Sequence, residues 1–348
     1  MVPLVNIAVG FVYSFTAASL LFINALVLFV LFRHKEFNTN TYRIIKNMIP
    51  GCMMQLCSHF IGGLMTMSNS NLNDYLERAA GAWIQSGWFL YLVASLALAI
   101  DRTLTFVFIV SEKNTIIISY VVLGFSWAVA LLYLVGLMLP GYGFTYLSNY
   151  GYFDWFYDKQ PGTQAYLTLE MCLDFSILVT VLSLYFVVFT RLIMMRRSGN
   201  ARISSSIVEI RILAIAMISF LYESTYLLWF FWGNHLLSDG IISSIIVTFL
   251  WIFDCGFFSI ATIVINGAIR RKILHMRKHS LAPSSSTKAE LRVLLVSVVS
   301  FCYEGTYLLW FFWGFVMITD QAYISVIATT LWIVECGFLS AVTIVLNS

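Results

Sequence analysis

The sequence predicts an all-α fold: a multi-pass transmembrane helix bundle with a seven-helix core and a repeated two-helix hairpin. Three observations predict it, namely composition, long apolar runs and an internal repeat. Of the 348 residues, 60% are hydrophobic and only 11% are charged, whereas a soluble domain carries about 25% charged residues. Most of the surface must therefore face lipid, which excludes soluble enzymes and nucleic-acid binders.

The predicted helices are continuous apolar runs of about 20 residues or more, the length that spans a bilayer. A transmembrane β-barrel would instead show alternating segments of about ten residues. Seven runs lie at about 5–32, 44–67, 80–108, 116–139, 166–193, 210–232 and 241–265, and two more at 291–313 and 322–346. The first run is too long for a signal-peptide core, so we expect it to stay in the membrane.

The placement of Lys and Arg predicts the orientation, because cytoplasmic loops retain positive charge. With the N-terminus outside, 18 of the 20 Lys and Arg residues fall on the cytoplasmic side, and only Arg78 and Lys159 fall outside. The basic, Ser-rich inner loop at 191–211 would then face anionic lipid.

The repeat joins residues 209–266 to residues 290–347 without gaps, at an offset of 81. YESTYLLWFFWG from Tyr222 matches YEGTYLLWFFWG from Tyr303. We expect a core at 1–272, a cytoplasmic linker at 273–289 and a repeated hairpin at 290–348. Either the second hairpin belongs to a working nine-helix protein, or it is a recent duplication or a misjoined gene end, which the gapless match favours.

Several motifs carry a resemblance to a known family. The pair Asp101–Arg102 in LALAIDRTLTF, Asn24 in the first run and Trp127 in the fourth are similar to those of G-protein-coupled receptors. The segments TYRIIKNM, GAWIQSGWFLYLVASLALAIDR, YFDWFYD and IVINGAIRR resemble the nematode serpentine chemoreceptors, of the class x or class T type, over about residues 5–272.

The resemblance implies a chemosensory receptor in the plasma membrane, such as that of a sensory-neuron cilium. Its partners would be an external odorant or other small molecule, membrane lipid and a heterotrimeric G protein, with Asp101 and Arg102 acting in coupling and activation. The third run has no outer Cys, the sixth no Pro and the seventh no Asn-Pro-x-x-Tyr pattern. Only Asp101 and Arg102 are therefore carried over from the family.

Four carboxylates lie inside the predicted core helices, where an unpaired charge costs several kcal/mol. They are Glu170, Asp174, Glu223 and Asp254. No Lys or Arg lies at comparable depth, so these acids must bind a cation or carry a proton.

We therefore predict that these acids form the polar floor of a ligand cavity, with Asp174, Glu223 and Asp254 about 10 to 20 Å below the outer boundary. The cavity would suit an amine or a hydrogen-bonding odorant, with Trp88 and Tyr226 as further contacts. Alternatively, the protonated acids hold helices together through hydrogen bonds, or hold one Na⁺. The aromatic outer loop at 141–162 would gate the cavity or form an interfacial aromatic belt.

The rival functions are a secondary transporter or a ligand-gated channel that uses the buried carboxylates, and a non-functional gene product. A transporter would show paired Gly/Pro breaks in its helices, and a channel would show a polar stripe along one helix. No catalytic residue, cofactor, metal site or nucleic-acid partner is expected, because the chain has no protease motif and no His/Cys cluster with metal-ligand spacing.

Overall fold

The structure is a computed structural model, and it describes residues 4–147, 154–160, 162–197, 206–236 and 240–280. The helices are α1 (Leu4–Arg33), α2 (Asn40–Ser68), α3 (Asp74–Phe106), α4 (Glu112–Met138), α5 (Thr163–Arg197), α6 (Ser206–Leu236), α7 (Gly240–Ile265) and α8 (Gly267–Ser280), with a short 3-10 helix η1 (Lys35–Phe37). Six helices are long and apolar enough to cross a membrane, and α6 contributes the apolar stretch Ile215–Phe231. The predicted all-α, multi-pass bundle is confirmed, while the second hairpin at 290–348 lies outside the described residues.

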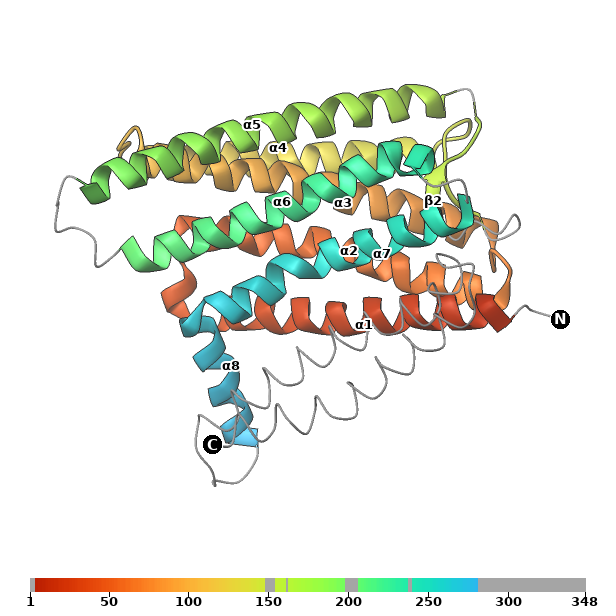
Figure 1. Cartoon of the computed structure of the whole chain (residues 1–348), viewed down its shortest axis with the longest axis horizontal. Coiled ribbons are helices and arrows are strands. Elements are labelled where there is room, and N and C mark those ends of the chain that lie inside the picture. The colour runs from red at the N-terminus through yellow and green to blue at the C-terminus, as the bar shows by residue number, and fades with distance from the viewer. Residues whose placement is uncertain (1–3, 148–153, 161, 198–205, 237–239, 281–348) are drawn as a thin grey trace, which may run out of the picture. The chain divides into compact units, whose positions relative to one another are not determined.

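The helices of the bundle lie side by side, with α3 in the middle (Figure 1). Helix α3 packs against α2, α4 and α5, and α1 packs against α2 and α7. The two ends of the bundle differ. One end, called here the hairpin end, carries the start of α1 and a β-hairpin (Figure 1). The other, called the Arg102 end, carries the last turns of α3, which contain Asp101 and Arg102.

Helix α3 begins at Asp74, six residues before the predicted apolar run. The side chain of Asn73 explains the early start, because its Oδ1 accepts hydrogen bonds from the backbone N–H groups of Tyr75 (2.8 Å) and Leu76 (3.4 Å). An N-cap of this kind satisfies donors that have no partner within the helix. Asp74 and Glu77 add negative charge to the first turn, where the helix dipole favours it.

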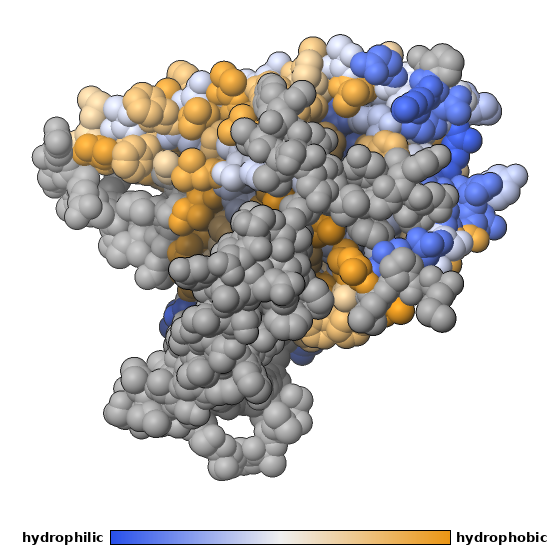
Figure 2. Space-filling view, turned by 45° about the vertical axis from the view of Figure 1, so that its right-hand side comes forward, coloured by the Kyte–Doolittle hydropathy of each residue, from blue (hydrophilic) through white to orange (hydrophobic). Residues whose placement is uncertain are grey.

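Apolar side chains cover the flank of the bundle, and hydrophilic residues gather to the right of the view in Figure 2. Phe22, Val121 and Phe186 are each more than 60% exposed. Exposing these apolar side chains to water would be unfavourable, whereas exposing them to the hydrocarbon core of a bilayer is not.

A β-hairpin was not predicted, and it fills the hairpin end of the bundle. Strands β1 (Phe144–Leu147) and β2 (Asp154–Tyr157) pair antiparallel, with Phe144 opposite Tyr157. The rings of Phe144, Tyr146 and Trp155 are each at most 1% exposed. These three rings are therefore buried in protein and are not part of a lipid-facing belt.

Two glycines allow the hairpin to approach the helices closely. A Cβ atom at Gly81 of α3 would overlap the carbonyl oxygen of Phe144. A Cβ atom at Gly62 of α2 would lie 3.0 Å from the ring of Tyr146 and 3.1 Å from Nε1 of Trp155. The backbone N–H of Tyr146 also donates to Oε1 of Glu77 (2.7 Å), so the hairpin is anchored to α3 by packing and by a charge-assisted hydrogen bond.

Candidate functional site

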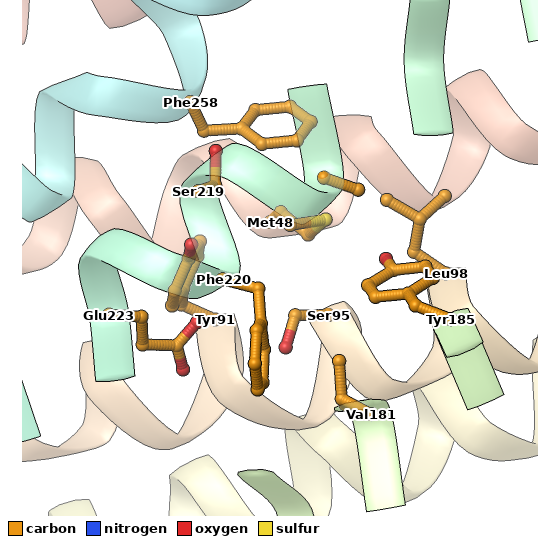
Figure 3. A pocket seen from close by; sticks show the side chains of 11 residues that line it. Met48, Tyr91, Ser95, Leu98, Val181, Tyr185, Ser219, Phe220, Glu223 and Phe258 are labelled. Atoms are coloured by element: carbon orange, nitrogen blue, oxygen red, sulfur yellow. The ribbon is translucent and has the colours of Figure 1, made fainter. Parts of the chain in front are cut away.

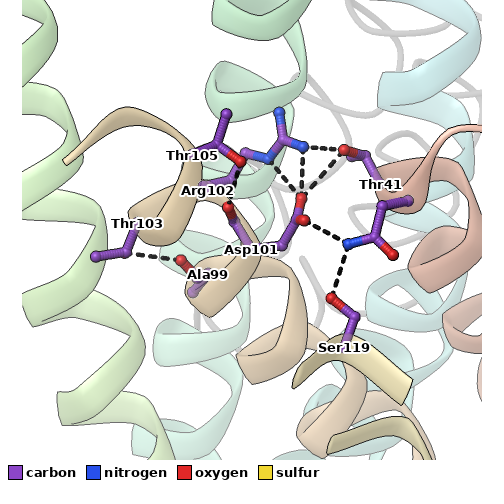
Figure 4. Close-up of polar contacts among 8 residues, drawn as sticks. Thr41, Ala99, Asp101, Arg102, Thr103, Thr105 and Ser119 are labelled. Atoms are coloured by element: carbon purple, nitrogen blue, oxygen red, sulfur yellow. Dashed lines mark hydrogen bonds and ion pairs between the residues drawn. The ribbon is translucent and has the colours of Figure 1, made fainter. Parts of the chain in front are cut away.

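A polar network at the Arg102 end joins α2, α3 and α4 (Figure 4). Asp101 and Arg102 are 1% and 3% exposed, and Nη2 of Arg102 forms an ion pair with Oδ2 of Asp101. The Thr41 hydroxyl accepts a hydrogen bond from Arg102 and donates one to Oδ2 of Asp101 (3.1 Å). Asn40 donates to Oδ1 of Asp101 (2.6 Å) and to Ser119 (2.7 Å).

This network, called here the Arg102 lock, keeps the guanidinium group within the bundle. Buried charges are tolerated when they are paired and hydrogen-bonded, and both conditions hold for Asp101 and Arg102. The sequence indicated only these two residues. Asn40, Thr41 and Ser119 are polar residues outside any recognisable motif, so the sequence did not identify them as partners.

Nearer the hairpin end, two acids of α5 face α3. Glu170 is 3% and Asp174 0% exposed. Gln85 donates from Nε2 to both carboxylate oxygens of Glu170 (3.2 and 3.3 Å), and the indole N–H of Trp88 donates to Oδ1 of Asp174 (3.1 Å). The two acids lie one helical turn apart, as their spacing of four residues requires.

An aromatic cluster borders these acids. The ring centroid of Tyr226 lies 5.6 Å from that of Trp88 and 5.7 Å from that of Trp251. Trp251 of α7 also contacts His59 at 5.1 Å and Phe144 of the hairpin at 6.3 Å. Trp251 therefore joins α2, α3, α6, α7 and the hairpin, although the sequence analysis did not select it.

Gln55 fixes the orientation of Trp251. Its Oε1 accepts a hydrogen bond from the indole N–H of Trp251 (2.6 Å) and a weak one from the Cys255 thiol (3.4 Å). The recurrence of Trp and Cys in LWIFDCG and LWIVECG was a signal for these two positions, whereas Gln55 carried none.

Glu223 and Asp254 complete the group of predicted ligand contacts. Both are 3% exposed, and Glu223 interacts electrostatically with Asp254 and Asp174. Tyr226 interacts in the same way with Glu170, Asp174 and Asp254. The structure thus brings the six residues predicted from sequence into one connected group, and their role as ligand contacts stays a prediction.

Glu223 also lines a small cavity between α2, α3, α5, α6 and α7 (Figure 3). Tyr91, Ser95, Tyr185 and Ser219 contribute further polar side chains to its wall. The cavity measures about 10 Å³, which is room for about one water molecule. The described part of the bundle is therefore closely packed at this depth.

The buried acids have no cationic partner in the described part of the chain. None of Glu170, Asp174, Glu223 and Asp254 forms an ion pair with a described Lys or Arg. His59 is buried at 1% exposure, and neither of its ring nitrogens has a hydrogen-bond partner among the described residues. The group is consequently rich in acids and lacks a fixed positive charge.

Asp154 of β2 is a further buried acid, at the hairpin end. Its Oδ1 accepts hydrogen bonds from the Thr248 hydroxyl of α7 (3.1 Å) and from the backbone N–H of Trp155 (2.7 Å). Burial raises the pKa of Asp154 to about 8, although both hydrogen bonds act to lower it. The hairpin is thus tied to α7 through a carboxyl group that resists ionisation.

The chain matches no protein-family model and no curated protein. Among solved structures it is similar to squid rhodopsin, with a TM-score of 0.64 and 13% sequence identity over 82% of this chain and 89% of the rhodopsin chain. The described bundle therefore has the seven-helix fold of rhodopsin. At this level of identity the likeness shows the fold alone.

Proposed function

We propose that this chain is a G-protein-coupled receptor that binds a small external molecule among its helices and signals to a heterotrimeric G protein. The observation that carries the proposal is the Arg102 lock, which lies in a rhodopsin fold at the end opposite the aromatic and acidic group. Such an arrangement supports communication between a ligand site at one end and a partner surface at the other.

The lock supports a simple switch. While Thr41 and Asp101 hold Arg102, its guanidinium donors are occupied within the bundle. A ligand that binds more tightly to an open conformation shifts the population toward it. Release of Arg102 would then present a planar set of N–H donors, which suits carbonyl and carboxylate groups of a G-protein terminus.

The finer assignment is a nematode serpentine chemoreceptor of the plasma membrane with its N-terminus outside. The motifs of α2, α3 and the hairpin loop and the bias of Lys and Arg to one side support it. The basic loop between α5 and α6 would contact anionic lipid and the G protein. The chain would have no enzymatic activity, and its odorant-class ligand would bind near Trp88 and Tyr226.

The lock predicts constitutive activity in a specific variant. Thr41→Val removes the hydroxyl that bonds both Asp101 and Arg102, so we expect basal nucleotide exchange on a co-expressed G protein to rise about tenfold. Arg102→Ala should reduce exchange to the level of membranes without receptor. The measurement is exchange of a labelled GTP analogue in membranes with equal surface expression.

Thr103→Val is the matched control. The Thr103 hydroxyl donates only to the Ala99 carbonyl of its own helix (2.8 Å), so this variant removes the same atoms without touching the lock (Figure 4). Equal exchange in Thr41→Val, Thr103→Val and the parent would contradict the proposal. Uptake of a solute, or a current without G protein, would favour a transporter or a channel instead.

A further inference from the structure

The neighbourhood of Glu170 and Asp174 contains buried polar atoms whose hydrogen-bonding capacity is not used by the described residues. Oδ2 of Asp174, Oε1 of Gln85 and the hydroxyl of Tyr133 have no hydrogen-bond partner among the described residues. All three side chains are at most 1% exposed. Buried polar atoms are nearly always hydrogen-bonded. The Gln85 carbonyl oxygen and an ionised Asp174 can only accept, so both lack a donor among the described residues, whereas the Tyr133 hydroxyl can donate as well as accept.

These atoms belong to one site. Gln85 bonds Glu170 through its Nε2, which leaves its carbonyl oxygen unused. Tyr133 of α4 interacts electrostatically with both Glu170 and Asp174. The first oxygen of Asp174 is occupied by Trp88, and the second is open. The acids, the amide and the phenol therefore converge from α3, α4 and α5.

The site also lacks positive charge. The two carboxylates have no described Lys or Arg as an ion-pair partner, and burial without a counter-ion is strongly unfavourable. Trp88 and Tyr226 lie beside the acids with their rings in edge-to-face contact, and the face of an aromatic ring attracts positive charge. A cation with several N–H donors would satisfy the acids, the unused acceptors and the rings together.

We propose that Glu170, Asp174, Gln85 and Tyr133 bind the ammonium group of a small primary amine. A primary ammonium group carries three N–H donors and no acceptor, which complements the open oxygens of Asp174 and Gln85 and the carboxylate of Glu170. The hydrocarbon part of the amine would lie beside Trp88 and Tyr226, whose side chains are 1% and 2% exposed and must move apart to admit it. This inference rests on the proposed function, since it names the ligand class of the proposed ligand site.

The test is thermal stabilisation of the purified full-length chain in detergent. The probes are hexylamine, cyclohexylamine and phenethylamine, each compared with its matching alcohol, and hexyltrimethylammonium, which keeps the charge but has no N–H donor. We expect the primary amines to raise Tm more than the alcohols and the quaternary ion. Asp174→Asn should weaken amine binding by at least about tenfold, the expected loss for a charged hydrogen bond.

Two further variants keep the test decisive. Asp74→Asn removes an exposed carboxylate at the start of α3 and should leave amine binding unchanged, which controls for the loss of one negative charge. Glu170→Gln repeats the test if Asp174→Asn does not fold. Equal stabilisation by amines and alcohols, no stabilisation by any amine, or full amine binding in Asp174→Asn would each overturn the inference.

The design separates this inference from the proposed function. Thermal stabilisation needs no G protein, so amine-specific binding that depends on Asp174 supports the inference even where no nucleotide exchange follows. In that case only the signalling role would fail. Conversely, if the alcohols evoke nucleotide exchange as well as the amines do, the proposed receptor function stands and the proposed amine ligand class is wrong.

Discussion

Asp154 shows how a single buried residue makes stability depend on pH. Its pKa is raised to about 8 in the folded chain, whereas an Asp in an unfolded chain has a pKa of about 4. Between these values the folded state binds a proton that the unfolded state has lost. The contribution of Asp154 to the free energy of unfolding is therefore largest below about pH 4. It is lost progressively as pH rises toward 8, because only the unfolded state gives up its proton in this range.

We predict that Asp154→Asn removes this dependence. In the parent chain, Tm in detergent should fall as pH rises from about 4 to 8, by on the order of ten degrees from this group. In Asp154→Asn the decline should be smaller, because an amide cannot ionise. Heat denaturation followed across this pH range checks it, with Asp74→Asn as the control for an exposed carboxylate. An unchanged slope in Asp154→Asn would refute the assignment.

The site residues differ in how well the sequence could indicate them. Glu170, Asp174, Glu223 and Asp254 were found because a charge in an apolar helix is conspicuous by composition alone. Thr41, Gln85 and Gln55 were not, because polar uncharged residues occur on many helix faces. Their importance comes from the partners that the tertiary fold brings within hydrogen-bond distance.

At the scale of elements, the β-hairpin packs against the helices at the hairpin end, where Phe144 contacts Trp251. Its strands contain four residues each, which is too short for a readable alternation of apolar and polar side chains. The helices, by contrast, can be predicted from apolar runs of about 20 residues. The hairpin position depends on Gly62 and Gly81, whose lack of a side chain matters only because Tyr146 and Phe144 pack there.

We predict that Gly81→Ala displaces the hairpin. The added methyl group would overlap the Phe144 carbonyl oxygen, and forcing extra atoms into a packed interior costs about 1–3 kcal/mol. Gly124→Ala is the matched control, since a Cβ at Gly124 of α4 meets nothing within 4 Å. Tm should fall in Gly81→Ala and stay level or rise in Gly124→Ala, where Ala favours the helix. Equal Tm values for both variants would argue against the close packing of the hairpin on Gly81.

At the scale of the whole molecule, the structure of the first copy of the repeat identifies buried positions, which can be compared with the second copy in the sequence. Among the side chains that the structure describes in the α6–α7 segment, nine polar ones are buried, namely Ser219, Glu223, Ser243, Ser244, Thr248, Asp254, Ser259, Thr262 and Asn266. Seven recur unchanged 81 positions later, Asp254 is replaced by the acid Glu335, and only Ser243 is lost, to Ile324. The connecting stretch 234–243 keeps only Asp239. The copy thus retains most of the polar side chains that are buried in the first hairpin.

This pattern predicts that the second hairpin can replace the first. Deleting residues 209–289 joins Val208 to Glu290 and restores a seven-helix chain in which Trp332 and Glu335 take the places of Trp251 and Asp254. We expect this chain to reach the cell surface and to keep at least half of the amine-dependent stabilisation, because most of the buried polar side chains are the same in the two hairpins.

Truncation after Ser280 is the matched control, since it keeps the first hairpin together with α8. Surface labelling and Tm in detergent compare the two chains, and Trp332→Ala in the deletion chain should lower Tm by the same amount as Trp251→Ala in the truncated chain. If the truncated chain folds and the deletion chain is retained inside the cell, residues 290–347 are no substitute for α6 and α7. If both fold, one seven-helix bundle can be completed by either hairpin, because seven of the nine buried polar side chains are the same in each.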